Sequence, residues 1–222
     1  MSEILKLTAS DGHQFDAYLA QPAGKPRAGV IVIQEIFGVN SHIRGVTDSY
    51  AKEGYLAIAP ALFDRIRPNI ELGYEAEDVT AGLELKGQVA PEQAVLDLQA
   101  AVTAVNAAGK VGVVGYCWGG LMTWLAATRV TGIAAASSYY GGGTVNYIDE
   151  TPHCPVMFHF GDQDHAIPME QVETIQQRQP DSALHVYPAG HGFNCDQRGS
   201  YEEVSARIAR DRTLDFFAKN LL

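Results

Sequence analysis

A cysteine between glycines is the clearest candidate for chemistry in this chain of 222 residues. Cys117 lies in a G-Y-C-W-G motif (115–119), after the apolar run 111–114 and before a stretch with helical spacing. A nucleophile elbow has this layout, because a strand turns sharply into a helix there and the glycines leave room for the nucleophile. The positive end of the following helix favours a thiolate. A buried structural cysteine can share the motif, but the strand before it and the helix after it favour a nucleophile.

A cysteine nucleophile needs a base, and the base needs an orienting acid. The candidate base is His191, in a Gly-His-Gly-Phe loop after the predicted strand Ala183–Tyr187. The candidate acid is Asp164, which follows another predicted strand, with Asp162 in the same turn as an alternative that could cap the next helix. A lone histidine in a glycine-rich loop is commonly a surface residue. The three groups together, however, follow the chain order of an α/β-hydrolase triad.

The segment Gln34–Asn40 follows an apolar strand, at the place where an α/β-hydrolase supplies a donor to its oxyanion hole. We predict that the backbone N–H groups of Ile36 and Trp118 are the two donors. Glu35 is an acid at the end of a buried strand, which is costly unless the carboxyl group is paired or protonated. The alternatives for Glu35 are a solvated loop carboxylate and an ion pair with Arg44.

The elements that must position these groups alternate between strand and helix. Short apolar runs, typical of strands covered on both faces, occupy residues 29–33, 55–59, 111–114, 132–136, 156–160 and 183–187. Helical spacing is found at residues 43–53, 91–107, 121–128 and 204–217. An antiparallel hairpin is predicted for residues 4–8 and 15–19. The sequence therefore predicts an α/β fold with a mostly parallel central sheet, an antiparallel N-terminal hairpin and helices on both faces.

The segment from Phe63 to Val89 is the least regular part of the chain. We interpret it as a cap or active-site loop, with a surface connection of no function as the alternative. No repeat or linker divides the sequence, so we predict a single domain over residues 1–222.

Composition and charge narrow the range of functions. The chain has 26 acidic and 16 basic residues, a formal net charge of −10, which disfavours binding to nucleic acids and to anionic membranes. We find no signal peptide, lipidation motif or apolar run of membrane-spanning length. The three cysteines show no C-x-x-C spacing. We therefore expect a cytoplasmic protein with reduced thiols, and a monomer.

The motifs together resemble the dienelactone hydrolase family of the α/β-hydrolase superfamily. The matching motifs are collinear over nearly the whole chain and lie at residues 34–40, 54–60, 115–120, 161–168, 190–193 and 212–217. The resemblance implies that Cys117 is the nucleophile, His191 the base and Asp164 the orienting acid. It implies that Glu35 interacts with the resting thiol and takes up its proton when substrate binds. It also implies hydrolysis of an enol-lactone such as a carboxymethylenebutenolide through a thioester, without a metal or cofactor.

The small lactone or activated ester expected as substrate needs a site for its carboxylate. Well-studied members of the family use two arginines, one in the irregular segment and one four residues after the catalytic histidine. Here Cys195 occupies the second position, so Arg198, Arg65 and Arg67 are the candidates. The predicted substrate-binding residues are Phe37, Tyr139, Phe193 and Arg198.

The absence of the expected arginines leaves open a second class of protein. In that alternative Cys117 is a redox- or electrophile-sensing thiol on the same fold, without ester turnover. Cys195 is interpreted as a second reactive thiol or a plain loop residue, and Cys154 as structural. His159, inside a predicted strand, is interpreted as a hydrogen-bonded core histidine rather than a metal ligand.

Overall fold

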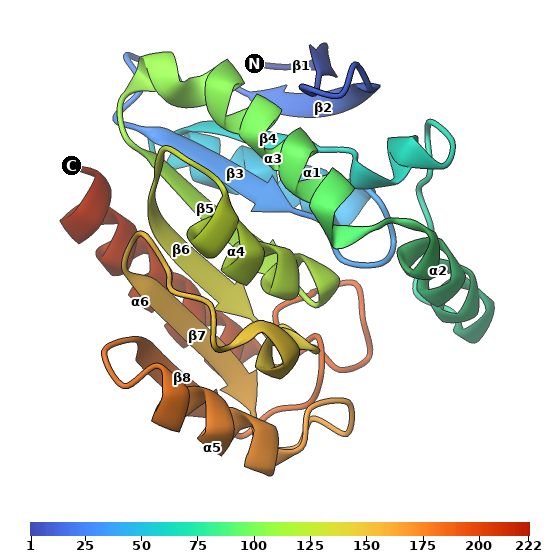
Figure 1. Ribbon diagram of the computed structural model, residues 1–222, viewed down its shortest axis with the longest axis vertical. Coiled ribbons are helices and arrows are strands. Elements are labelled where there is room, and N and C mark those ends of the chain that lie inside the picture. The colour runs from blue at the N-terminus through green and yellow to red at the C-terminus, as the bar shows by residue number, and fades with distance from the viewer.

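The computed structural model describes residues 1–222, and one eight-stranded sheet runs through the molecule (Figure 1). The strands are β1 (Ser2–Thr8), β2 (Gln14–Ala20), β3 (Gly29–Ile33), β4 (Leu56–Pro60), β5 (Val111–Tyr116), β6 (Ile133–Tyr139), β7 (Val156–Gly161) and β8 (Ala183–Tyr187). Their order in the sheet is β1-β2-β4-β3-β5-β6-β7-β8, and only β2 runs against the others. The predicted mostly parallel sheet with its N-terminal hairpin is confirmed.

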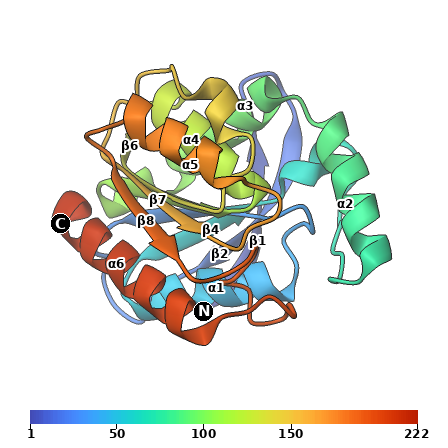
Figure 2. The ribbon, with the colours of Figure 1, turned by 90° about the horizontal axis from the view of Figure 1, so that it is seen from below.

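Helices cover both faces of this sheet, as predicted. The helices are α1 (Ser41–Lys52), α2 (Ala76–Gln88), α3 (Pro91–Val105), α4 (Trp118–Arg129), α5 (Met169–Arg178) and α6 (Glu203–Leu221), with short 3₁₀ turns η1 (Leu62–Arg65), η2 (Asn106–Ala108) and η3 (Thr144–Tyr147). Figure 2 shows α3, α4 and α5 on one face and α1 and α6 on the other, with α2 standing to the side. None of these helices combines the length and apolar character that a bilayer span requires.

Two helices are absent from the sequence prediction. The interpretation of residues 63–89 as irregular is wrong for α2, which begins at a capping box formed by Glu75 and Asp78. The helix buries only Gly82 and Leu85, so its apolar face is too narrow to produce a clear helical period. Helix α5 was missed for the same reason, since Val172 and Ile175 are its only buried residues.

Strand register brings the candidate residues to one edge of the sheet. Ile33 at the end of β3 pairs with Gly115 of β5, so the loop after β3 begins beside the elbow. Gly161 at the end of β7 pairs with Tyr187 at the end of β8. The loops after these strands therefore leave from the same edge. Because parallel strands end together, residues far apart in the sequence can meet there.

Candidate active site

Cys117 occupies a strained turn between β5 and α4. Its backbone angles are φ 55° and ψ −117°, in a half of conformational space that residues with a side chain rarely adopt. A Cβ atom at Gly115 would overlap the carbonyl oxygen of Gly119, and one at Gly119 would overlap the carbonyl oxygens of Ile33 and Gln34. The two glycines are therefore required by close backbone contacts, as the elbow prediction assumed.

The structure brings Cys117, His191 and Asp164 together in one line of contacts. His191 Nε2 lies 3.1 Å from Cys117 Sγ, and Nδ1 of the same ring lies 2.8 Å from Asp164 Oδ2. The other carboxylate oxygen of Asp164 accepts hydrogen bonds from the backbone N–H groups of Ala166 and Ile167, at 2.8 and 3.2 Å. Asp164 is thus held in place on both oxygens, whereas the alternative acid Asp162 is exposed.

The electrostatic surroundings of His191 favour its protonated form. Burial by itself would lower the pKa of His191, but the Cys117 sulfur and the Asp164 carboxylate together raise it to about 10. An imidazolium beside the sulfur stabilises a thiolate, which is the nucleophilic form of cysteine. The contacts with Cys117 and Asp164 therefore hold the proton of His191 more tightly than water holds it on a free imidazole.

Two free backbone donors flank the nucleophile. The Ile36 N–H, in the loop after β3, donates to no backbone oxygen. The Trp118 N–H is at the first position of α4, so it has no carbonyl partner within the helix. Both residues line the same cavity as Cys117. Donors arranged in this way can bind the oxyanion that develops when a carbonyl group is attacked.

The cavity in front of Cys117 has a volume of about 650 Å³ and is mainly apolar. Its lining comes from the loop after β3, from α2, from the elbow, from the segment around η3 and from the loop before α6. Apart from His191, the lining side chains with a positive charge are Lys86 and Arg198. A cavity of this size suits a small ligand with an apolar body and an acidic group.

A family model, that of the Dienelactone hydrolase family, matches residues 15–221. The chain belongs to this family. Over 229 aligned residues it is 38% identical to a Synechocystis protein named "Putative carboxymethylenebutenolidase", covering 94% of this chain and 93% of the relative. It is 33% identical to the carboxymethylenebutenolidase of Pseudomonas putida, covering 98% and 97% of the two chains.

The fold comparison agrees with the family. A crystal structure from Klebsiella pneumoniae, described as a "Putative Dienelactone Hydrolase", matches with a TM-score of 0.87 and 34% identity, and the match covers 99% of both chains. As a member of the dienelactone hydrolase family, the chain is a hydrolase that acts on ester or lactone bonds.

In this member of the family, Glu35 differs from the expectation. It is fully buried, as predicted, but the resting thiol contacts His191, and Glu35 pairs instead with Arg198, whose Nη1 donates to Glu35 Oε1 at 3.2 Å. The reason is electrostatic, because the guanidinium compensates a carboxylate that has been removed from water. The alternative partner Arg44 pairs with Glu71.

Two of the predicted substrate-binding residues, Phe37 and Arg198, line the cavity. The prediction is wrong for Tyr139 and Phe193, which are fully buried and do not reach it. The Tyr139 hydroxyl lies 2.7 Å from Thr213 Oγ1, and the ring of Phe193 packs on Tyr187 with centroids 5.2 Å apart. Both rings belong to the core between the sheet and α6, because their strand and loop direct them away from the cavity.

The segment interpreted as a cap or active-site loop contributes α2 to the cavity wall, although its helical form was not predicted. Val79, Leu83 and Lys86 of this helix line the cavity, although the helix lies far from the elbow in the sequence. The Glu75-x-x-Asp78 pattern was the available signal for its start. Of the other candidate arginines, Arg65 forms ion pairs with Asp11 and Asp97 and is not in the cavity lining.

Proposed function

We propose that this hydrolase opens a small lactone or cleaves an activated ester through a thioester on Cys117. The observation that carries the proposal is the continuous line of contacts from Asp164 through His191 to the Cys117 sulfur, ending beside the cavity and the two free N–H groups. Nucleophile, base, orienting acid and oxyanion donors are the parts that acyl transfer requires.

In the acylation step, the Cys117 thiolate attacks the carbonyl carbon of the ester and a carbon–sulfur bond forms. The carbonyl oxygen becomes an oxyanion, which the N–H groups of Ile36 and Trp118 bind. The carbon–oxygen bond to the leaving group then breaks, and the leaving oxygen takes the proton from His191 Nε2. In a lactone the leaving group stays attached to the acyl chain, so the ring opens on the enzyme.

In the deacylation step, neutral His191 removes a proton from a water molecule, and the hydroxide attacks the thioester. The carbon–sulfur bond breaks, the acid is released, and the thiolate–imidazolium pair forms again. Asp164 holds the imidazole in the required tautomer and orientation during both steps.

The substrate class follows from the cavity and from the nucleophile. A thiolate is expelled from the tetrahedral intermediate more easily than an alkoxide, so a good leaving group such as an enolate or an aryl oxide is required. Phe37 offers an aromatic face, and Arg198 and Lys86 offer positive charge within the cavity. A flat unsaturated lactone that carries a carboxylate, such as a carboxymethylenebutenolide, has both features.

The test compares the wild type with Cys117→Ala and Cys117→Ser on an enol-lactone and on a p-nitrophenyl ester. We expect at least a 10³-fold loss of kcat/KM in the alanine variant, because the covalent route is removed. Mass spectrometry of the wild type mixed with a slow ester should show one acyl group, on the peptide that contains Cys117. Circular dichroism checks that the variants are folded.

Two results would overturn the proposal. One is ester turnover that survives in Cys117→Ala. The other is selective alkylation of Cys117 by iodoacetamide without turnover of any lactone or aryl ester and without protection by them, which is the behaviour of a thiol sensor on this fold.

A further inference from the structure

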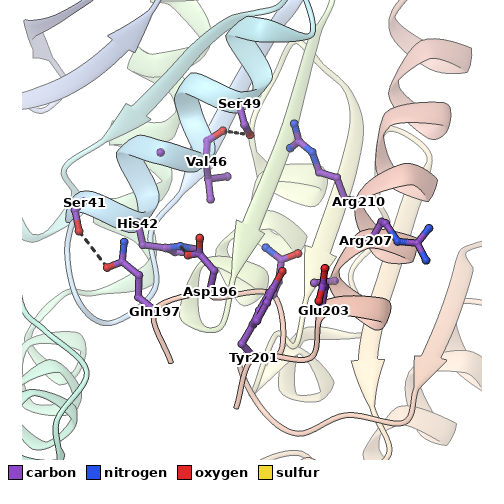
Figure 3. Close-up of a pocket in the computed structure, with 13 residues that line it drawn as sticks. Ser41, His42, Val46, Ser49, Asp196, Gln197, Tyr201, Glu203, Arg207 and Arg210 are labelled. Atoms are coloured by element: carbon purple, nitrogen blue, oxygen red, sulfur yellow. Dashed lines mark hydrogen bonds and ion pairs between the residues drawn. The ribbon is translucent and has the colours of Figure 1, made fainter. Parts of the chain in front are cut away.

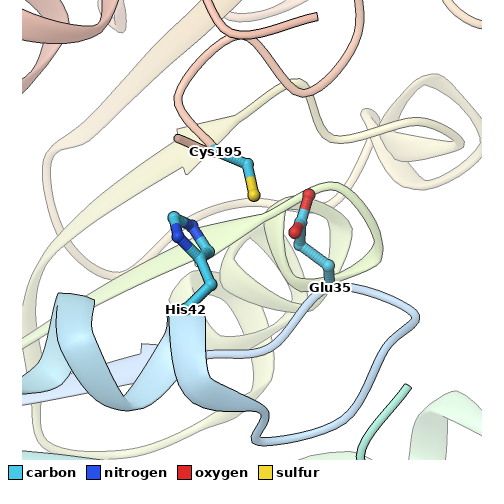
Figure 4. Close-up of side chains that lie close together, drawn as sticks. All are labelled: Glu35, His42 and Cys195. Atoms are coloured by element: carbon cyan, nitrogen blue, oxygen red, sulfur yellow. The ribbon is translucent and has the colours of Figure 1, made fainter. Parts of the chain in front are cut away.

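A second group of chemically active side chains lies behind the substrate cavity. Glu35, His42 and Cys195 come from the loop after β3, the first turn of α1 and the loop before α6, and their side chains converge (Figure 4). One ligand atom of each lies within 4.8 Å of those of the other two. All three residues are buried, and the proposed reaction uses neither His42 nor Cys195.

Two buried polar atoms of this group have no partner. Glu35 uses Oε1 to bind Arg198, but its Oε2 accepts no hydrogen bond, and His42 Nε2 is likewise unpaired. A buried polar atom without a partner destabilises the fold, because its hydrogen bonds to water are lost and not replaced. Both atoms belong to the same cluster as the Cys195 thiol, so a single ligand between the three residues would satisfy them together.

His42 is oriented in the way that metal-binding histidines usually are. Its Nδ1 lies 3.0 Å from Asp196 Oδ1, which fixes the ring and leaves the lone pair of Nε2 free. A carboxylate on the second ring nitrogen is the usual support for a histidine that binds zinc. Because Asp196 is exposed, this support connects the buried cluster to the surface.

We propose that Glu35 Oε2, His42 Nε2 and Cys195 Sγ bind a divalent transition metal ion of the zinc type. Thiolate, imidazole and carboxylate are the three ligand types that zinc accepts in proteins, and a water molecule completes four-fold coordination. Ligand atoms around tetrahedral zinc lie about 3.3–3.8 Å apart, so the side chains close in by about 1 Å. The Cys195 thiol releases its proton to solvent as the sulfur–metal bond forms.

A groove adjoins the cluster on the side of His42, whereas Glu35 and Cys195 are not part of its wall. It has a volume of about 510 Å³, lies between α1 and α6, and includes His42 and Asp196 in its wall (Figure 3). The Ser41 hydroxyl and Gln197 form a hydrogen bond of 3.1 Å across its rim. The groove is separate from the substrate cavity, since the two share no lining residue.

The experiment uses the full chain with Cys117→Ala, because Cys117 and His191 could themselves bind a metal ion. We expect one equivalent of Co²⁺ to produce a thiolate-to-cobalt charge-transfer band and the visible bands of a tetrahedral ion, and Zn²⁺ to displace it. The readout is metal binding, so it is independent of the proposed hydrolysis.

Three further variants in the same background test the Cys195 ligand and the support of His42. Cys195→Ser should remove the charge-transfer band, while Cys154→Ser, a matched change at a half-buried thiol, should retain it. Asp196→Asn should weaken the affinity about tenfold or more by removing support from His42, and its exposed position keeps the fold intact. No cobalt band, or a band that persists in folded Cys195→Ser, would overturn the proposal and indicate a buried water as the only occupant.

Discussion

At the scale of single residues, the pair formed by Glu35 and Arg198 connects the core to the cavity. Glu35 is fully buried, whereas Arg198 keeps a partly exposed side chain and lines the cavity. The Arg198 guanidinium also lies over the ring of Phe37, 5.5 Å from its centroid. This one arginine therefore compensates a buried charge and offers donors toward a substrate.

Replacing Arg198 by glutamine should affect both stability and binding. Glu35 would lose its ionic partner, and we expect the free energy of unfolding to fall by about 3 kcal/mol. The KM for a carboxylate-bearing ester should rise about tenfold or more, since a charge-assisted hydrogen bond is lost, while the KM for a neutral p-nitrophenyl ester stays nearly constant.

Urea unfolding and steady-state kinetics check these values. The double variant Glu35→Gln/Arg198→Gln is the control, because it removes both charges and should recover most of the lost stability. An equal rise of KM for the charged and the neutral ester would show that Arg198 does not bind the carboxylate.

The raised pKa of His191 predicts how stability depends on pH. The folded protein holds this proton up to about pH 10, while the unfolded chain loses it near 6.5. The stabilisation is therefore fully present below pH 6.5 and is lost as the pH rises to about 10. The advantage of the wild type over His191→Gln in urea unfolding should shrink across this range, and NMR of the imidazole should show the titration directly. An advantage that is constant with pH would contradict the raised pKa of His191.

At the scale of secondary structure, α2 closes one side of the cavity and approaches the loop after β3 at Ile36. The helix approaches so closely at Gly82 that an added Cβ atom would overlap the carbonyl oxygen of Ile36. The position of the Ile36 peptide group thus depends on a glycine more than forty residues away in the chain. Figure 1 shows α2 standing apart from the layers that cover the sheet, so few other contacts hold it.

The substitution Gly82→Ala tests this dependence. We expect kcat/KM for lactones and esters to fall about tenfold or more, because the Ile36 donor is displaced from the oxyanion. Alanine is the better helix former by about 1 kcal/mol, and this gain opposes the cost of moving the Ile36 peptide group. We therefore expect the free energy of unfolding to change little. The matched control is Gly45→Ala in α1, where an added Cβ atom meets nothing within 4 Å. Equal kcat/KM values for the two variants would show that the contact between Gly82 and Ile36 does not affect catalysis.

At the scale of the whole molecule, a buried polar cluster joins the sheet to the C-terminal helix. His159 of β7 contacts the Tyr187 hydroxyl of β8 at 2.8 Å and Thr213 Oγ1 of α6 at 3.1 Å. Ser137 of β6 also lies 3.0 Å from Thr213 Oγ1. His159 is thus the hydrogen-bonded core histidine that the sequence indicated, and burial lowers its pKa well below the ordinary value.

This buried histidine predicts acid instability. The unfolded chain binds a proton at His159 below about pH 6.5, while the folded protein resists it, so falling pH favours unfolding. The contribution is about 1.4 kcal/mol for each pH unit below 6.5. In His159→Gln, whose amide can keep one of the two contacts, the slope of unfolding free energy against pH should be smaller by that amount. Urea titrations between pH 5 and 7 measure it, and identical slopes would contradict the assignment.

The sequence by itself determined the features that depend on short-range order. The elbow around Cys117, the runs of β-branched residues and the order of nucleophile, acid and histidine are local patterns, because turn geometry and burial periodicity act over a few residues. The parallel sheet follows from the alternation of strands and helices, and its register then brings Asp164 and His191 to the edge where Cys117 lies.

Only the tertiary structure decided which distant side chains meet. Arg198 lies 163 residues from Glu35, and no local pattern distinguishes that arginine from Arg65 or Arg67. The burial of Tyr139 and the cluster around Cys195 likewise depend on loop packing against a completed sheet. The physical reason is that side-chain periodicity encodes which face is buried, whereas partner choice in loops depends on contacts between segments that come together only after the sheet has formed.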